Sequence, residues 1–145
     1  MRMLHRLKPV PLLFATTCYA ENICPWLNAA TAAGILGGPV TASVSPAVCE
    51  FIRPQSTLHI EVRKKPATIE AKCESKGTPL KGIGNEAVIC LESTFITGGL
   101  TTKMVIGRVR DQRFAVWIRT SDPDLAPTVS DRTRKIAEQV AGNLF

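Results

Sequence analysis

Histidine is scarce in this chain of 145 residues, which contains only two. A metal site built from several histidines is therefore excluded, and a nucleophile that depends on a histidine base has few candidates. The five cysteines include no Cys-x-x-Cys pair. That spacing is typical of zinc sites and of thioredoxin-like redox proteins, so both classes are disfavoured.

Aromatic residues are also few, at 6% of the chain. They form no interleaved series on which bases could stack, which argues against nucleic acid as a partner. Hydrophobic residues make up 45% and charged residues 21%, a balance that excludes intrinsic disorder and a polytopic membrane protein. There is no internal repeat or low-complexity tract. The length fits one domain rather than two.

The amino end has the order of a secretory signal peptide. Arg2, Arg6 and Lys8 form a basic start without acidic residues, an apolar stretch follows at residues 10–15, and the small residue Ala20 suits cleavage. The apolar stretch is far shorter than the ~20 residues needed to span a bilayer. We therefore predict a cleaved signal peptide.

The predicted boundary divides the chain into a signal peptide at residues 1–20 and a single domain at residues 21–145. The domain is expected to be exported, to the periplasm, the cell envelope or the extracellular space. Two alternatives remain: a frayed or buried amino-terminal segment, and a possible lipoprotein in which Cys18 is lipidated.

The cysteine count supports export. Removal of residues 1–20 leaves an even number of cysteines, and a small exported domain with such a set usually forms disulfides. Three connectivities are open. We favour nearest-neighbour pairing, because each bridge would then join a helix to a neighbouring strand. The predicted bridges are Cys24–Cys49 and Cys73–Cys90. The alternative is four buried free thiols in a cytosolic protein.

The pattern of apolar residues predicts an α+β fold. We expect an antiparallel β-sheet of about five strands, with helices packed on one face and two disulfides. The helix at the amino end has Pro25 at its first position and ends at Gly37, and the last helix begins with a capping box, Thr128-x-x-Asp131. Helices are expected at 24–38, at 67–76 and from about 130; loops at 41–47 and 77–84; and strands at 48–53, 57–65, 86–92 and in a hairpin over 103–120.

The hairpin provides the clearest expectation about register. A two-residue loop of Asp111 and Gln112 would place Val109 opposite Phe114 and Val105 opposite Ile118. The core-facing residues of the hairpin are then Val105, Gly107, Val109, Phe114, Val116 and Ile118.

Three short motifs occur in order within residues 22–120. They are Asn22-Ile23-Cys24-Pro25-Trp26-Leu27, then Cys49-Glu50-Phe51, and finally Gly82-Ile83-Gly84-Asn85-Glu86-Ala87. Together they resemble a family of small exported domains of unknown function found in bacterial envelope lipoproteins, notably in actinobacteria. The resemblance implies a Cys24–Cys49 disulfide and a helix-on-sheet fold, and it implies no chemistry. The chain departs from the family in lacking a lipobox, which puts membrane anchoring in doubt.

No catalytic or metal-binding constellation is evident, and no cofactor is expected. His59 is expected to be a solvated strand residue. Asp122 and Asp124 suit a turn better than a Ca²⁺ site, which usually needs six or more oxygens. Gly82-x-Gly84 lacks the rest of a phosphate-binding loop. The carboxylates available to a hydrolase are Glu61, Glu86, Glu92 and Asp111, with none favoured.

The face of the hairpin opposite its core residues is rich in arginine. Arginine binds carboxylates and phosphates through paired hydrogen bonds, and a tryptophan can add stacking or cation–π contact. Ile106 lies between these residues, and His59 would extend the same face if strand 57–65 pairs with the hairpin. The candidate ligand face consists of Arg63, Arg108, Arg110, Arg113, Trp117 and Arg119.

These observations predict a non-catalytic exported domain that binds an anionic envelope component or another envelope protein, and not nucleic acid. Two alternatives are a small secreted hydrolase that uses carboxylates and a cystatin-like protease inhibitor; the latter rests on general helix-on-sheet analogy. The alternative interpretation of the arginine-rich face is a solvated sheet surface without a ligand, with Trp117 covered by a loop or a helix.

Overall fold

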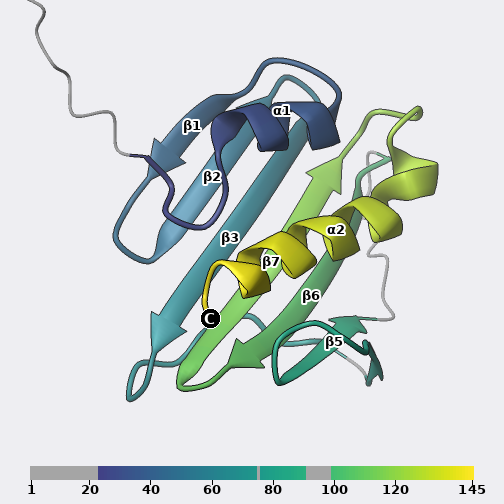
Figure 1. Cartoon of the computed structure of the whole chain (residues 1–145). Helices are drawn as coiled ribbons and strands as arrows, with labels where there is room; N and C mark the ends of the chain where they lie inside the picture. The colour runs from purple at the N-terminus through teal and green to yellow at the C-terminus, as the bar shows by residue number, and fades with distance from the viewer. Residues whose placement is uncertain (1–22, 75, 91–98) are drawn as a thin grey trace, which may run out of the picture.

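The computed structural model describes residues 23–74, 76–90 and 99–145. A single antiparallel sheet carries two α-helices, α1 (Ala29–Leu36) and α2 (Val129–Gly142), both on the same face (Figure 1). A short 3₁₀ turn, η1 (Ala126–Thr128), precedes α2. The strands are β1 (Thr41–Val44), β2 (Val48–Arg53), β3 (Ser56–Lys64), β4 (Gly77–Pro79), β5 (Glu86–Cys90), β6 (Thr101–Val109) and β7 (Gln112–Thr120).

The sheet has seven strands, so the expected five-stranded α+β fold is wrong. Their order is β1-β2-β3-β7-β6-β5-β4, with antiparallel pairing throughout. β1 and β4 lie at the two edges of the sheet, within residues that were expected to form loops. Edge strands bury little and are short, and β4 contains a proline, which is tolerated at an edge. They therefore lack the alternation of buried and exposed residues that is typical of the central strands.

The helix expected at residues 67–76 is also wrong, because none of the described residues of this stretch, 67–74 and 76, is helical. It must carry the chain from the end of β3 to β4, past β7, β6 and β5. Neighbouring strands are about 4.8 Å apart, so the lateral step alone is roughly 19 Å. A ten-residue helix would reach only about 15 Å, whereas an extended segment covers this span easily.

Helix α1 begins later than the sequence predicts. Residues 24–28 are not helical, and the first turn is capped by Asn28, whose Oδ1 accepts a hydrogen bond of 2.7 Å from the Thr31 amide. The predicted stop is confirmed: Gly37 adopts a left-handed conformation with φ of 87°, and its amide donates to the carbonyl of Ala33. A side chain would be strained in this conformation.

Helix α2, expected from about residue 130, packs one face against the sheet. Val129, Thr133, Ile136 and Val140 are buried, and Leu144 beyond the helix is partly buried. The predicted capping box is wrong, because the Thr128 side chain makes no cap hydrogen bond. Its hydroxyl donates to the Leu125 carbonyl instead.

The hairpin of β6 and β7 has the predicted core residues in a different register. Gly107 lies opposite Phe114 and Val105 opposite Val116, a shift of two residues from the expected pairing. A shift of two keeps every side chain on its face, since side chains alternate with a period of two. The turn is formed by Arg110 and Asp111, and Arg110 has a positive φ of 55°.

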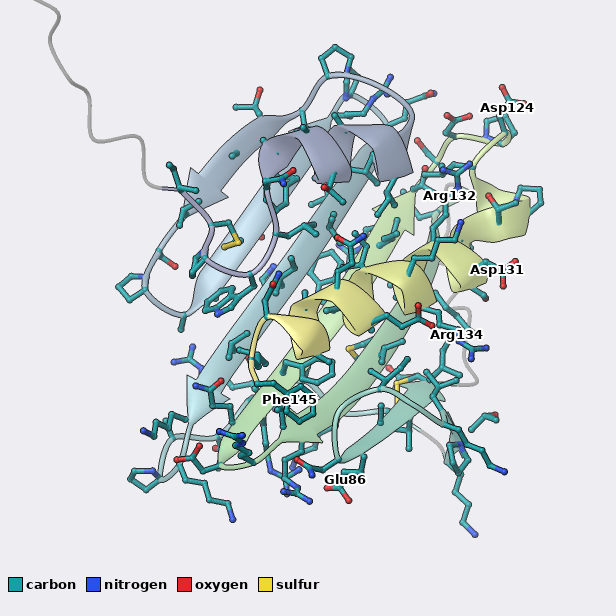
Figure 2. All side chains as sticks on the ribbon, in the orientation of Figure 1. Glu86, Asp124, Asp131, Arg132, Arg134 and Phe145 are labelled. Carbon is teal, nitrogen blue, oxygen red and sulfur yellow. A yellow bond between two sulfur atoms is a disulfide. The ribbon has the colours of Figure 1, made fainter. Side chains whose placement is uncertain are left out.

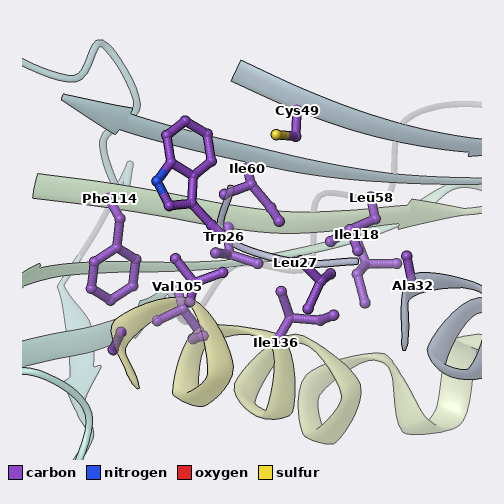
Figure 3. Close-up of a cluster of buried hydrophobic side chains, with 14 of the residues drawn as sticks. Trp26, Leu27, Ala32, Cys49, Leu58, Ile60, Val105, Phe114, Ile118 and Ile136 are labelled. Carbon is purple, nitrogen blue, oxygen red and sulfur yellow. The ribbon is translucent and has the colours of Figure 1, made fainter. Parts of the chain in front are cut away.

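The hydrophobic core lies between the helices and the sheet (Figure 3). Ile136 of α2 and Ala32 of α1 meet Leu58, Ile60 and Ile118 of the central strands there, all fully buried. Trp26 and Leu27, in the segment before α1, also enter this core.

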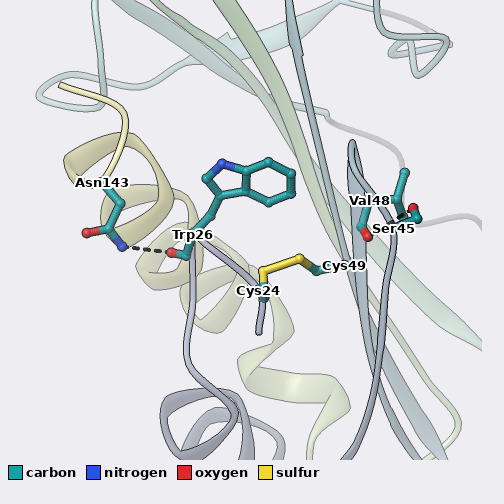
Figure 4. The surroundings of a disulfide bond; sticks show 6 residues. All are labelled: Cys24, Trp26, Ser45, Val48, Cys49 and Asn143. Atoms are coloured by element: carbon teal, nitrogen blue, oxygen red, sulfur yellow. Dashed lines mark hydrogen bonds between the residues drawn. A yellow bond between two sulfur atoms is a disulfide. The ribbon is translucent and has the colours of Figure 1, made fainter. Parts of the chain in front are cut away.

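The two disulfides join the pairs favoured by the sequence, Cys24–Cys49 and Cys73–Cys90. Cys49 lies on the helix-covered face, where Cys24 anchors the segment that precedes α1 (Figure 4). Cys90 lies on the other face, because it alternates with Ile89 and Ala87, which point to the core side. Neither bridge joins a helix to a strand as expected: Cys24 precedes α1, and Cys73 lies in the irregular segment.

Two disulfides are typical of an oxidising, exported environment. Neither helix in the described part of the chain has the length and hydrophobicity to cross a membrane.

Candidate functional site

The sheet face opposite α1 and α2, here called the open face, carries the predicted ligand residues except Arg110. Strand pairing aligns its side chains in rows that cross several strands. One row contains Glu50, His59, Trp117 and Met104; the next contains Val48, Glu61, Ala115, Ile106 and Val88; the third contains Arg63, Arg113, Arg108 and Glu86.

The third row places three arginines side by side. Arg113 of β7 lies directly opposite Arg63 of β3 on one side and Arg108 of β6 on the other. We call these three residues the arginine row. With strands about 4.8 Å apart, their Cα atoms span roughly 10 Å. Like charges directly opposite each other on neighbouring strands are destabilising, so the arrangement itself requires an explanation.

The outer two arginines have acidic partners. Arg63 Nη2 lies 3.4 Å from Glu61 Oε2, and Arg108 Nε lies 3.2 Å from Glu86 Oε1. The Arg63–Glu61 pair does not satisfy all of its polar atoms, since Arg63 Nε and Glu61 Oε1 are buried without a hydrogen-bond partner among the described residues.

Arg113, in the middle of the row, differs from its neighbours. Within the described ranges, its guanidinium forms no ion pair and no side-chain hydrogen bond. The side chain is half-buried, so the charge is held at the sheet surface. A half-buried cation flanked by two others is a site of positive potential that an anion would relieve.

Arg110, one of the predicted ligand residues, does not lie on this face. It sits in the hairpin turn, where its amide donates a 2.6 Å hydrogen bond to Asn85 Oδ1 and its carbonyl accepts one of 2.8 Å from Arg108 Nη1. Its role in the structure is to fix the turn and to hold the Arg108 side chain. The shift in register explains the difference, because the predicted loop was one residue further along.

Trp117 is the centre of the first row, four residues from Arg113 along β7. His59 stacks on its indole ring, with centroids 4.5 Å apart and an interplanar angle of 5°. His59 Nδ1 in turn lies 3.0 Å from Glu50 Oε1. The Arg119 guanidinium carbon lies 5.1 Å from the Trp117 ring centroid, within cation–π range. His59 is thus a packing partner of Trp117 rather than an isolated solvated residue.

A cavity of about 220 Å³ adjoins Trp117 on the open face. The irregular segment after β3 and the Cys73–Cys90 disulfide both contribute to its lining. The cavity was not foreseen because the segment was expected to be a helix. Its lining is Lys72, Cys73, Glu74, Cys90, Thr102, Met104, Trp117 and Arg119.

Glu61 and Glu86, two of the carboxylates considered for a hydrolase, do not converge. Glu61 pairs with Arg63, Glu86 with Arg108 and Asp111 with Lys64; Glu92 lies outside the described residues. β3 and β5 are separated by β7 and β6, which places Glu61 and Glu86 roughly 14 Å apart at a strand spacing of about 4.8 Å. Paired catalytic carboxylates of glycosidases are about 5–9.5 Å apart, so these residues do not form such a pair.

Within the described ranges, no group of three or more His, Cys, Asp or Glu residues is arranged to hold a metal ion. Asp122 lies in a turn, as the sequence suggests, where its Oδ1 accepts from the Asp124 amide.

Comparison with protein-family models, curated proteins and solved structures finds no match to this chain. The resemblance to exported envelope domains therefore stays a prediction. The site has to be interpreted from its own geometry, namely the arginine row and the cavity beside Trp117.

Proposed function

We propose that this protein is an exported, non-catalytic domain that binds an anionic ligand or partner at the cell envelope through the arginine row. The observation that carries the proposal is the position of Arg113, a half-buried cation without an acidic partner in the described chain, between Arg63 and Arg108. Arginine donates paired, parallel hydrogen bonds to phosphate or carboxylate oxygens, and three neighbouring guanidinium groups suit a surface rich in such groups.

Electrostatics within the sheet supports this proposal. Cross-strand pairs of like charge lower stability, and pairs of opposite charge contribute about 0.2–1 kcal/mol each. An acidic residue at position 113 would therefore suit the fold better than arginine does. The arginine at this position is explained more readily by a ligand than by folding.

Vesicle binding tests the proposal through Arg113→Glu. Each basic residue near an anionic membrane surface contributes about 1 kcal/mol, so reversing one charge should weaken binding to phosphatidylglycerol vesicles by about 2 kcal/mol, close to thirtyfold. The same substitution should leave the free energy of unfolding unchanged or raise it by up to about 1 kcal/mol, because the new carboxylate lies between two arginines. Co-sedimentation and urea unfolding measure the two effects.

The matched control is Arg134→Glu, the same exchange on α2, on the opposite side of the sheet (Figure 2). It should leave vesicle binding within about twofold, and it should lower stability by roughly 0.5 kcal/mol because Arg134 pairs with Glu138. Equal binding by Arg113→Glu and the unchanged protein would exclude the arginine row as the binding surface.

Export through a cleaved signal peptide forms the second part of the proposal. The support is the pair of disulfides together with the basic, apolar and small-residue order of residues 1–20, which lie outside the described part of the chain. Mass spectrometry of the secreted protein should identify Glu21 as the first residue. A mature chain that begins with an acylated Cys18 would contradict this cleavage site and indicate a lipoprotein.

A further inference from the structure

The cavity beside Trp117 is a feature of the open face that the arginine row does not use. Its lining includes Trp117, Met104 and the Cys73–Cys90 disulfide. These are flat or polarisable surfaces, which suit an aromatic ring. An apolar cavity of about 150 Å³ can hold benzene, so 220 Å³ accommodates one ring with a small substituent.

The indole ring is held in place by the stacked His59, and the Arg119 guanidinium lies within cation–π range of it. β3 and β6 flank β7 on opposite sides, and His59 on β3 stacks on the ring while Met104 lies opposite Trp117 on β6. The contact of His59 with Glu50 fixes the stacking partner in turn. Trp117 is therefore already oriented with its β6 side toward the cavity, so a ligand would not have to order it on binding.

The polar groups of the cavity favour an acid. The hydroxyl of Thr102 is buried in the lining and has no hydrogen-bond partner in the described structure. A buried hydroxyl without a partner is unfavourable by itself, and a ligand oxygen would satisfy it. Arg119, beside the ring, and Lys72 bring two positive charges to the lining, against the one negative charge of Glu74.

We propose that this cavity binds a small aromatic carboxylate, with the ring on Trp117 and Met104 and the carboxylate at Arg119 and Thr102. This site is distinct from the proposed anion surface, since Trp117 lies four positions after Arg113 on β7, about 13 Å along the strand. The two proposals can therefore fail separately.

Nuclear magnetic resonance of the full chain provides the test, with benzoate as the probe. The chain has two tryptophans, so two indole N–H signals are expected, and Trp117→Phe identifies which one belongs to Trp117. Benzoate should shift the Trp117 signal and leave that of the buried Trp26 in place, with a dissociation constant on the order of 1 mM for so small a ligand. Benzamide, which has the same shape without the charge, should bind about tenfold more weakly.

Two variants test the assigned contacts. Arg119→Gln should weaken benzoate binding about tenfold and benzamide binding little, because it removes only the charge-assisted contact. Thr102→Val keeps the shape, removes the hydroxyl and should weaken benzoate binding about fivefold, while the unfolding midpoint stays the same or rises because an unpaired buried group is gone. Arg110→Gln, in the hairpin turn, is the matched control for Arg119 and should leave benzoate binding unchanged.

The proposal is overturned if benzoate at about ten times the expected dissociation constant leaves the Trp117 signal unshifted. Equal binding of benzoate and benzamide, or tighter binding of a neutral sugar such as glucose than of benzoate, would overturn it as well. Arg113→Glu should leave benzoate binding intact, which separates this result from the outcome of the vesicle experiment.

Discussion

Phe114→Ala is expected to lower the free energy of unfolding by about 3–5 kcal/mol, the usual range for removing a fully buried phenylalanine. Phe114 is 0% exposed, and its ring covers Gly107 on the neighbouring strand. A Cβ atom at position 107 would collide with that ring, so the two residues form a matched pair in which only glycine leaves room for the aromatic side chain. Urea unfolding followed by circular dichroism measures the loss.

Phe145→Ala is the matched control, because the same side chain is removed where it is 66% exposed at the carboxyl end. It should change stability by no more than about 0.5 kcal/mol. If Phe114→Ala and Phe145→Ala have equal effects, the packing of Phe114 over Gly107 does not exist as described. Gly107→Ala offers an independent check, since it should also destabilise the protein, by about 1–3 kcal/mol, through overpacking.

The same pair of residues decides the geometry of the candidate site. With the register expected from the sequence, Arg108 would lie opposite Ala115, and Arg113 opposite Arg110. The observed register places Arg108 opposite Arg113 instead. Both registers put the arginines on one face, which is why the face could be predicted from alternation alone. The arginine row could not, because it depends on the turn at Arg110 and on the fit of Phe114 over Gly107.

The central strands were predictable for a related reason. Leu58, Ile60 and Val62 alternate with polar neighbours because these apolar residues face the helices, whereas the polar residues between them lie on the open face. β1 and β4 have no such pattern: all of β1 except Val44 is exposed, and β4 is only three residues long. β1 is placed by its pairing with β2, and β4 by its pairing with β5. The residues of an edge strand alone therefore do not predict its position.

The cavity beside Trp117 depends on contacts between residues that are distant in the sequence. Residues 67–76 have a helical composition, but the crossing from β3 to β4 and the bridge from Cys73 to Cys90 require an extended path. Tertiary constraints of this kind commonly override propensity. One signal was available in the sequence: Cys90 lies two residues after Val88 and four after Glu86, on the same face of β5, which places its disulfide partner on the open face.

Loss of the Cys24–Cys49 bridge is the second large effect that we expect. Cys24→Ala/Cys49→Ala should lower the free energy of unfolding by about 3 kcal/mol, because the bridge closes a loop with a sequence separation of 25. The bridge also anchors the segment that carries Trp26 and Leu27 into the core, and the Trp26 carbonyl accepts a 2.7 Å hydrogen bond from Asn143 after α2 (Figure 4). The variant should therefore shift the indole signal of Trp26.

Cys73→Ala/Cys90→Ala is the matched control, since it removes a bridge of similar separation, 17 residues, on the other face of the sheet. It should lower stability by a comparable amount, about 3 kcal/mol, but shift the indole signal of Trp117, whose cavity the bridge lines. Each tryptophan thus reports on one bridge. If Cys24→Ala/Cys49→Ala unfolds at the same urea concentration as the unchanged protein, the Cys24–Cys49 bridge does not stabilise the fold as described. If both variants shift the same indole, the assignment of one bridge to each face of the sheet is wrong.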